Sequence, residues 1–231
     1  MTVTIDHAPR LAVRIAVRIA RDLAARGARA WTMAVPGGSV AASVLPHLAR
    51  QPLPWTACDV VFADERRVDA GDDASNWRAC RTATAGTAMD DARWHRLPAD
   101  LAEPGEVVRR YAATLREVAG DPPVLDVVIL GVGQDGHVAS LFPGHVHDAP
   151  GGVLFDGAAP KPPAARFSLA MDVLVRARLA CVVALGAAKR DIVRDAVSGG
   201  AGLPVTALLH ASAAPWLLAD PEAAGDTAAD G

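Results

Sequence analysis

The chain of 231 residues has few of the features that mark several common protein classes. Its three cysteines, Cys58, Cys80 and Cys181, are odd in number and scattered, with no CxxC spacing. This pattern indicates buried thiols in a reducing compartment and argues against a disulfide framework or a zinc site. No apolar run is long enough to cross a bilayer, and the N-terminus has no signal-peptide pattern. We therefore expect a cytoplasmic protein without a membrane partner.

Lysine is almost absent as well. Only Lys161 and Lys189 stand among the 23 basic residues, and the others are arginines. A lysine in such a background indicates a place where the compact ammonium group is wanted, with coding bias and chance as alternative explanations. The basic residues are well mixed with 26 acidic ones, and the formal net charge is −3. Because there is no basic run, no nucleic-acid partner is expected.

The composition is otherwise that of an ordinary globular protein, with 51% hydrophobic and 21% charged residues. Residues 11–26 repeat apolar side chains at helical spacing and end at Gly27, a typical helix stop. Strands are expected at 28–35, 59–63, 125–130, 166–170 and 180–185, and further helices in the first part of 40–50, from Ser75, at 106–118 and at 189–197. The polar stretch 64–76 is expected to be a loop, and the Gly- and Pro-rich stretch 143–163 an irregular excursion.

Strands that alternate with helices predict an α/β fold. Because there is no internal repeat and no long Gly/Ser linker, the simplest interpretation is one domain over residues 1–231. We expect an open, mainly parallel sheet with helices on both faces, a Rossmann-like three-layer arrangement, with fraying at 1–8 and 221–231. In such sheets ligands bind at the carboxyl ends of the strands, and three polar clusters of this chain follow an expected strand.

The first cluster is Pro36-Gly37-Gly38-Ser39. Small residues between a strand and a helix let backbone amides approach an anion, and the helix N-terminus adds favourable partial charge. An ordinary turn in which Ser39 caps the helix explains the same residues. The spacing Gly37-x-Ser39-x-Ala41 also approaches the nucleophile elbow of α/β-hydrolases. That motif has a second glycine where Ala41 stands, so a serine esterase is the weaker interpretation.

The second cluster is Asp64-Glu65-Arg66, with the polar pair Ser75-Asn76 further along the same stretch. Two adjacent acids and an arginine after a strand can bind sugar hydroxyls or tune the pKa of a base. A solvated charge run explains them too, and on this cluster alone it is the favoured explanation.

The third cluster, residues 131–137, has the sequence GVGQDGH and satisfies the dinucleotide pattern G-x-G-x-x-G after a strand. A dinucleotide turn opens a long helix, whereas here Pro143 and Gly144 follow closely, so nucleotide binding is not favoured. The remaining feature is Asp135 two residues before His137. A histidine can take a proton from water near neutral pH, and a nearby carboxylate can orient it. A lone histidine is more often structural, but this position favours a functional one.

Two cations complete the set of candidates. Arg166 begins the strand at 166–170 and Lys189 begins a helix, and each could hold a phosphate or form only a surface salt bridge. His145 and His147 resemble a metal pair, but their spacing in a Gly/Pro loop supports one only weakly. We therefore expect neither a metal nor a cofactor.

Taken in order, these segments resemble the 6-phosphogluconolactonase family, within the wider glucosamine-6-phosphate isomerase/deaminase superfamily. The resemblance runs from Trp31 to Asp220 and includes the segments PGGSV, FADERRV, SNWR, LDVVILGVGQDGHVASLFPG, RFSL and LGAAKRDIV. The segment DGHVASLFPG is the most specific of them. The sequence departs from the family at Pro36, where serine is common, and at Val40-Ala41, where Thr-Pro is usual, which puts the shape of that loop in doubt.

The resemblance implies an open α/β fold and hydrolysis of 6-phospho-D-glucono-1,5-lactone in the oxidative pentose phosphate pathway. It implies His137 as general base on water, with Asp135 close by and Arg66 near the substrate. The residues expected to bind the substrate and its phosphate are Gly37, Gly38, Ser39, Asp64, Asn76, Arg166 and Lys189. The expected partner is thus a small sugar-phosphate lactone, bound by a monomer or a small homo-oligomer.

Two alternatives remain. Deaminases of the same superfamily follow the DGH segment with Phe-Asn-Glu-Pro, whose glutamate assists ring opening, whereas this chain has Leu141-Phe142-Pro143-Gly144 and no acid there. That contrast favours a lactonase. A non-catalytic sugar-phosphate sensor is the other alternative, but such regulators usually carry a helix-turn-helix, and the region before Trp31 is too short for one.

Overall fold

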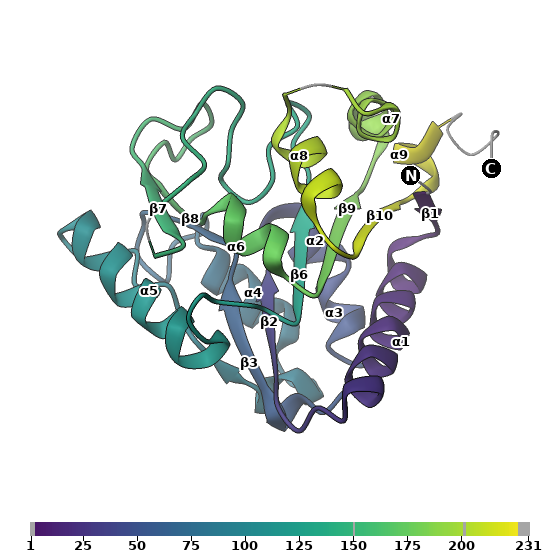
Figure 1. Cartoon of the computed structure of the whole chain (residues 1–231), viewed down its shortest axis with the longest axis horizontal. Helices are drawn as coiled ribbons and strands as arrows, with labels where there is room; N and C mark the ends of the chain where they lie inside the picture. The colour runs from purple at the N-terminus through teal and green to yellow at the C-terminus, as the bar shows by residue number, and fades with distance from the viewer. Residues whose placement is uncertain (1–2, 150, 201, 226–231) are drawn as a thin grey trace.

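The protein is described here by a computed structural model covering residues 3–149, 151–200 and 202–225. Its central feature is a seven-stranded parallel sheet in the order β1-β10-β9-β6-β2-β3-β5 (Figure 1). These strands are β1 (Val3–Ile5), β2 (Trp31–Val35), β3 (Cys58–Phe62), β5 (Arg93–Trp94), β6 (Val127–Gly131), β9 (Leu179–Ala184) and β10 (Pro215–Ala219). The predicted α/β fold with a mainly parallel sheet is therefore confirmed.

Helices flank this sheet and give the molecule its layers (Figure 1). They are α1 (Ala8–Arg26), α2 (Gly38–Ser43), α3 (Leu45–Leu48), α4 (Asn76–Thr84), α5 (Pro104–Ala119), α6 (Met171–Arg176), α7 (Arg190–Ser198), α8 (Pro204–Ala211) and α9 (Pro221–Ala224), with short 3-10 turns at η1 (Trp55–Ala57), η2 (Ala88–Asp91) and η3 (Ala187–Lys189). Helices α1 to α4 pack against one another, and α6 packs against α8. The predicted helix at 11–26 is present and begins three residues earlier.

Burial explains why these segments form these elements. Strands β2 and β9 are buried along their whole length, as is typical of parallel strands that are covered on both faces. Helix α1 turns Leu11, Ile15 and Ile19 into the core and keeps its arginines outside. Gly27 ends the helix with a positive φ of 58°, a conformation that glycine adopts without a steric penalty.

A second, three-stranded antiparallel sheet corrects the sequence-based expectations. It has the order β4-β8-β7 and consists of β4 (Asp64–Arg66), β8 (Arg166–Leu169) and β7 (Val153–Asp156). The stretch 64–76, expected to be a loop, therefore begins as a strand, and the excursion 143–163 contains one. Strand β8 lies where a strand was predicted, but outside the parallel sheet. Strand β4 forms by pairing with the distant β8, which local sequence does not reveal, whereas β7 pairs with the next strand along the chain, β8.

The two ends of the chain also differ from expectation. Residues 1–8 were expected to fray, yet β1 pairs with β10 along Val3–Ile5 and extends the sheet. At the other end α9 forms because the Asp220 side chain accepts a hydrogen bond of 2.7 Å from the Ala223 amide. The rest of the expected C-terminal fraying, at 226–231, lies outside the described residues.

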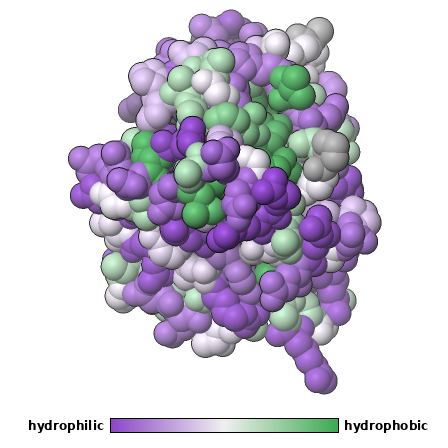
Figure 2. Space-filling model, turned by 90° about the vertical axis from the view of Figure 1, so that its left-hand side faces the viewer, coloured by the Kyte–Doolittle hydropathy of each residue, from purple (hydrophilic) through white to green (hydrophobic). Residues whose placement is uncertain are grey.

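The face of the molecule shown in Figure 2 is mainly polar. Hydrophilic side chains predominate on the face shown in Figure 2, with apolar ones gathered in a smaller area. Among the described residues, no helix is both long enough and apolar enough to span a membrane.

Candidate active site

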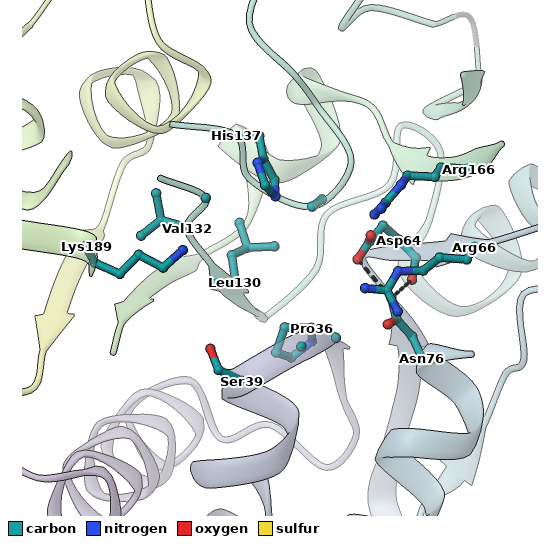
Figure 3. Close-up of a pocket in the computed structure, with 15 residues that line it drawn as sticks. Pro36, Ser39, Asp64, Arg66, Asn76, Leu130, Val132, His137, Arg166 and Lys189 are labelled. Atoms are coloured by element: carbon teal, nitrogen blue, oxygen red, sulfur yellow. Dashed lines mark hydrogen bonds between the residues drawn. The ribbon is translucent and has the colours of Figure 1, made fainter. Parts of the chain in front are cut away.

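A polar cavity of about 170 Å³ lies at the carboxyl ends of the central strands (Figure 3). Strands β2 and β6 are neighbours there. The next strand of the main sheet that pairs with β2 is β3, on one side, and the one that pairs with β6 is β9, on the other side, so the connections leave the two strands in opposite directions. Such a switch point opens a crevice between the diverging loops. The cavity is lined by Pro36, Gly37, Gly38, Ser39, Asp64, Arg66, Asn76, Leu130, Gly131, Val132, Gly133, His137, Ala139, Arg166 and Lys189. Nine of the ten predicted site residues are among them, and the tenth, Asp135, contacts His137.

His137 and Asp135 form a hydrogen-bonded pair in the turn after β6. The Nδ1 of His137 lies 2.5 Å from Oδ1 of Asp135. The turn is held by a hydrogen bond of 2.8 Å from the Gly133 amide to the His137 carbonyl. The buried ring of Phe142 packs 4.5 Å from the imidazole, measured between ring centroids. The imidazole is therefore fixed by Asp135 on one side and by an aromatic ring on another.

The environment keeps His137 neutral near pH 7. Burial lowers its pKa below the usual 6.5, and the repulsion of the Lys161 ammonium acts in the same direction, while Asp135 opposes both. Burial alone would raise the pKa of Asp135, but the hydrogen bond and charge of His137, together with Lys161, lower it. Asp135 is thus a carboxylate, which only accepts hydrogen bonds, so Nδ1 of His137 carries the proton and Nε2 is free to accept one.

Gly133 makes room for this pair, a role that the sequence did not reveal. An ideal Cβ at this position would fall well inside 3.0 Å of both the His137 ring and the Asp135 carboxylate. Real Cβ atoms essentially never come so close to another heavy atom. Only glycine at 133 therefore permits the observed arrangement of the imidazole and the carboxylate.

The acids after β3 are buried, so the interpretation of a solvated charge run is wrong. The exposed fractions of Asp64 and Glu65 are 6% and 3%. Glu65 accepts hydrogen bonds from the amides of Asn76 and Trp77, at 2.7 and 2.8 Å, and so caps α4. Helix α4 starts at Asn76 after its N-cap Ser75, as predicted. Glu65 is therefore a structural acid, whereas Asp64 lines the cavity.

Asp64 is held by two neutral side chains. Its Oδ2 accepts a hydrogen bond of 2.7 Å from Ser140 Oγ, and its Oδ1 accepts one of 3.2 Å from Asn76 Nδ2. Sequence reasoning missed Ser140, which follows the DGH segment by only a few residues. Arg66 is fixed in turn by a hydrogen bond of 2.6 Å from Nη1 to the Ala74 carbonyl. The polar residues from β4 and α4 thus form one connected wall of the cavity.

The turn after β2, which contains Gly37 and Gly38, packs against Asn76 of that wall. A Cβ at Gly37 would collide with the Asn76 carboxamide, so only glycine lets the backbone approach so closely. Gly38 has a positive φ of 61° and opens α2, with Gly37 as its N-cap. Ser39 is therefore not the cap, because the helix begins one residue before it. The alternative explanation of Ser39 as N-cap is wrong for this reason.

Lys189 and Arg166 approach the cavity from opposite sides of His137 (Figure 3). Within the described part of the chain neither forms an ion pair with an acid, which excludes the surface salt bridge as the role of either. Burial lowers the pKa of Lys189, and the nearby Lys161 ammonium contributes to this. Arg166 donates hydrogen bonds from Nε to the Pro163 carbonyl at 3.0 Å and from Nη2 to the Lys161 carbonyl at 3.1 Å. It holds a loop as well as lining the cavity.

The other sequence motifs do not form sites. The His145 ring is hydrogen-bonded to Asp156 at 2.7 Å, and the His147 ring to the Phe142 carbonyl at 2.6 Å. Among the described residues, no three His, Cys, Asp or Glu side chains lie close enough together to hold a metal ion. The G-x-G-x-x-G pattern ends in a tight turn with a bridge between Val138 and Leu141 and not in a long helix.

Comparison with known proteins agrees with this geometry. A model of the family described as "Glucosamine-6-phosphate isomerases/6-phosphogluconolactonase" matches residues 5–216. The chain is 33% identical to the 6-phosphogluconolactonase of Synechocystis sp. over 186 residues, 78% of this chain and 76% of the relative. It is 32% identical to that of Rhizobium meliloti over 216 residues, 89% of this chain and 90% of the relative.

Solved structures of related enzymes have a similar fold. The fold is similar to that of a 6-phosphogluconolactonase from Shewanella baltica, with a TM-score of 0.81 and 25% identity over 95% of this chain and 97% of the other. A monomeric glucosamine-6-phosphate deaminase shares the fold, with a TM-score of 0.78 and 19% identity over 97% of this chain and 99% of the other. By its sequence relatives and its fold, the chain belongs to the 6-phosphogluconolactonase family, within the broader family of glucosamine-6-phosphate isomerases and 6-phosphogluconolactonases.

Proposed function

We propose that this enzyme, a carboxylic ester hydrolase, converts 6-phospho-D-glucono-1,5-lactone to 6-phosphogluconate, a step of the oxidative pentose phosphate pathway. The observation that carries the proposal is the position of His137 at the cavity, held by Asp135 through Nδ1 so that Nε2 is free, and burial lowers the pKa of this imidazole. A base of this kind can activate water without a metal or a covalent intermediate.

In this mechanism His137 moves one proton twice. Its Nε2 takes a proton from a water molecule whose oxygen attacks C1 of the lactone and forms a tetrahedral oxyanion. When the bond between C1 and the ring oxygen breaks, the imidazolium returns the proton to the leaving oxygen. Asp135 stabilises the imidazolium in between and keeps the ring in place. Acid–base catalysis of this type contributes on the order of 10²–10⁴-fold.

The cations of the cavity supply the binding energy for the substrate phosphate. Lys189 and Arg166 line the cavity together with the turn of Gly37, Gly38 and Ser39, whose small residues expose backbone amides. Arg166 presents a forked guanidinium and Lys189 a compact charge, and both groups suit a phosphate. Binding of the phosphate by these groups fixes the position of C1 relative to His137.

The wall of Arg66, Asp64 and Asn76 lies on the same side of the cavity as Arg166, away from Lys189, and suits the sugar hydroxyls (Figure 3). Asp64 can accept hydrogen bonds, and Arg66 can donate them. Asn76 fixes this wall, because its Nδ2 donates hydrogen bonds to the backbone carbonyl and to Oδ1 of Asp64, at 2.9 and 3.2 Å.

The segment after His137 favours hydrolysis over deamination. Leu141 and Phe142 are fully buried and apolar, and Pro143 follows, so this segment brings no carboxylate to the base. An activated water molecule is sufficient for opening a lactone, whereas the deaminases of the superfamily are expected to use an additional acid at this place.

The test is turnover of lactone generated in place from glucose 6-phosphate, followed against its spontaneous hydrolysis. We expect turnover well above background, and a decrease of about 10²–10⁴-fold in His137→Ala, with binding of 6-phosphogluconate retained. Full activity of His137→Ala would refute the role of this base. Glucosamine 6-phosphate is assayed in parallel, because release of ammonia without lactone turnover would place the chain with the deaminases. Binding without turnover in either assay would make it a sensor.

A further inference from the structure

Besides His137, Asp135 has a cationic neighbour. Its Oδ1 contacts Nδ1 of His137, while its Oδ2 lies 3.3 Å from Nζ of Lys161. The carboxylate thus stands between an imidazole and an ammonium, with one oxygen for each. Lys161 itself is not among the residues that line the cavity.

The loop that carries Lys161 is well fixed. It has prolines at positions 160, 162 and 163, whose rings restrict φ and reduce the entropy lost on ordering. Arg166 donates to the carbonyls of Lys161 and Pro163, at 3.1 and 3.0 Å, and the Ala159 amide donates to the Ala164 carbonyl at 3.0 Å. The backbone of Lys161 is therefore held in place by the hydrogen bonds and prolines of its loop.

The composition of the chain supports a specific role. Lys161 and Lys189 are the only lysines of the sequence, and both are at this site, while arginine serves everywhere else. A compact ammonium can approach one carboxylate oxygen without competing for the other, whereas the guanidinium fork tends to engage both. Lysine at 161 thus leaves Oδ1 of Asp135 to His137.

We propose that Lys161 is a positioning residue for the base His137, acting through Asp135. This inference rests on the proposed function of His137 as the base. Lys161 holds Oδ2 of the carboxylate, which aims Oδ1 at the imidazole, and it neutralises part of the carboxylate charge. Asp135 can then orient the ring without making it so basic that it is protonated at neutral pH.

The other charges around His137 agree with this role. Asp64 on β4 attracts a proton to the imidazole and Lys161 repels one, and Lys189 on η3 with Arg166 and Arg66 add positive charge around the same cavity. The repulsion of Lys161 lowers the pKa of His137, in the same direction as burial. Loss of the ammonium therefore raises the pKa of His137, because burial is then left to oppose Asp135 without the repulsion of Lys161.

The test compares Lys161→Met, which removes the charge, with Lys161→Arg, which keeps it. The matched control is Arg109→Met, since Arg109 forms an ion pair of similar length, 3.2 Å to Glu106, on the remote helix α5. Because an exposed ion pair contributes little to stability, all three variants are expected to fold. In Lys161→Met, the acid limb of the kcat/KM profile is expected to move to higher pH. The loss of activity is then larger at pH 6 than at pH 8.

A second measurement does not depend on any substrate. The His137 imidazole is titrated by NMR, with its signal assigned by its disappearance in His137→Gln. We expect its midpoint at higher pH in Lys161→Met, not raised in Lys161→Arg, which keeps the charge, and near the wild-type value in Arg109→Met. A moved titration in a protein that hydrolyses no lactone would support the role of Lys161 and refute the proposed function. An unmoved titration would overturn the inference, as would an increase in KM of equal size at every pH, since Lys161 would then contact the substrate directly.

Discussion

Gly133→Ala is the most direct test of how tightly His137 and Asp135, the proposed catalytic pair, are held. The added Cβ would fall about 1 Å inside the 3.0 Å limit that Cβ atoms keep from other heavy atoms, and the first atom it meets is Nδ1 of His137. It would also collide with Oδ1 of Asp135, so neither partner of the hydrogen bond can remain in place. The backbone at Gly133 does not have a positive φ, so the effect of the methyl group is a matter of space alone.

The geometry gives the size of the effect. The imidazole must shift by about 1 Å, and a displacement of that size in a catalytic group costs roughly 10²-fold in rate. We expect kcat for the lactone to fall by about 10²-fold, while binding of 6-phosphogluconate, measured by calorimetry, changes little. This split follows because the residues proposed for the phosphate lie outside the turn that carries Gly133.

The control is Gly71→Ala, which adds the same methyl group at a position where a Cβ meets no atom within 4 Å. It should retain wild-type kcat, and thermal unfolding of both variants separates local displacement from loss of the fold. If Gly133→Ala kept kcat within about threefold of wild type while remaining folded, the argument that this turn fixes the base would be wrong.

Two further predictions concern titration. Because the neutral imidazole is the active form and burial lowers its pKa, kcat/KM should fall only as pH decreases below about 6.5. In Asp135→Asn the carboxylate that favours the imidazolium is gone, so the acid limb should move to still lower pH, with a lower plateau, in a pH series of initial rates. Burial raises the pKa of the Cys58, Cys80 and Cys181 thiols, to about 12 for Cys181. A thiol reagent at pH 8 should therefore label none of them before unfolding and all three afterwards, and rapid labelling of the native protein would contradict the structure.

The candidate residues chosen from the sequence lie together because each group of them follows a strand of the same sheet. The turns that carry Gly37 and His137 each follow a parallel strand, and parallel strands end at the same edge of a sheet. Chain order alone therefore places these residues together. Lys189 follows the next strand of the same sheet and reaches the same cavity for the same reason.

What the sequence did not predict depends on contacts between distant segments. Strand β4 is short and charged, and it forms because Asp64–Arg66 pairs with β8. The position of Lys161 is set by hydrogen bonds from Arg166 to backbone carbonyls, for which a Gly/Pro-rich stretch gives no local signal. The scarcity of lysine in the sequence singled out Lys161. The sequence alone could not show that this residue contacts Asp135.

The small antiparallel sheet has a consequence for how the enzyme becomes active during folding. It places Arg66 in register with Arg166, although a long segment of chain with two strands of the main sheet, β5 and β6, separates the two. Contacts between such distant segments carry a large loop-closure cost and tend to form late. A partly folded chain with its central strands and helices in place would still lack one wall of the cavity. Turnover is thus a more stringent indicator of complete folding than helical content, because it requires the pairing of β4 with β8 as well as the main sheet.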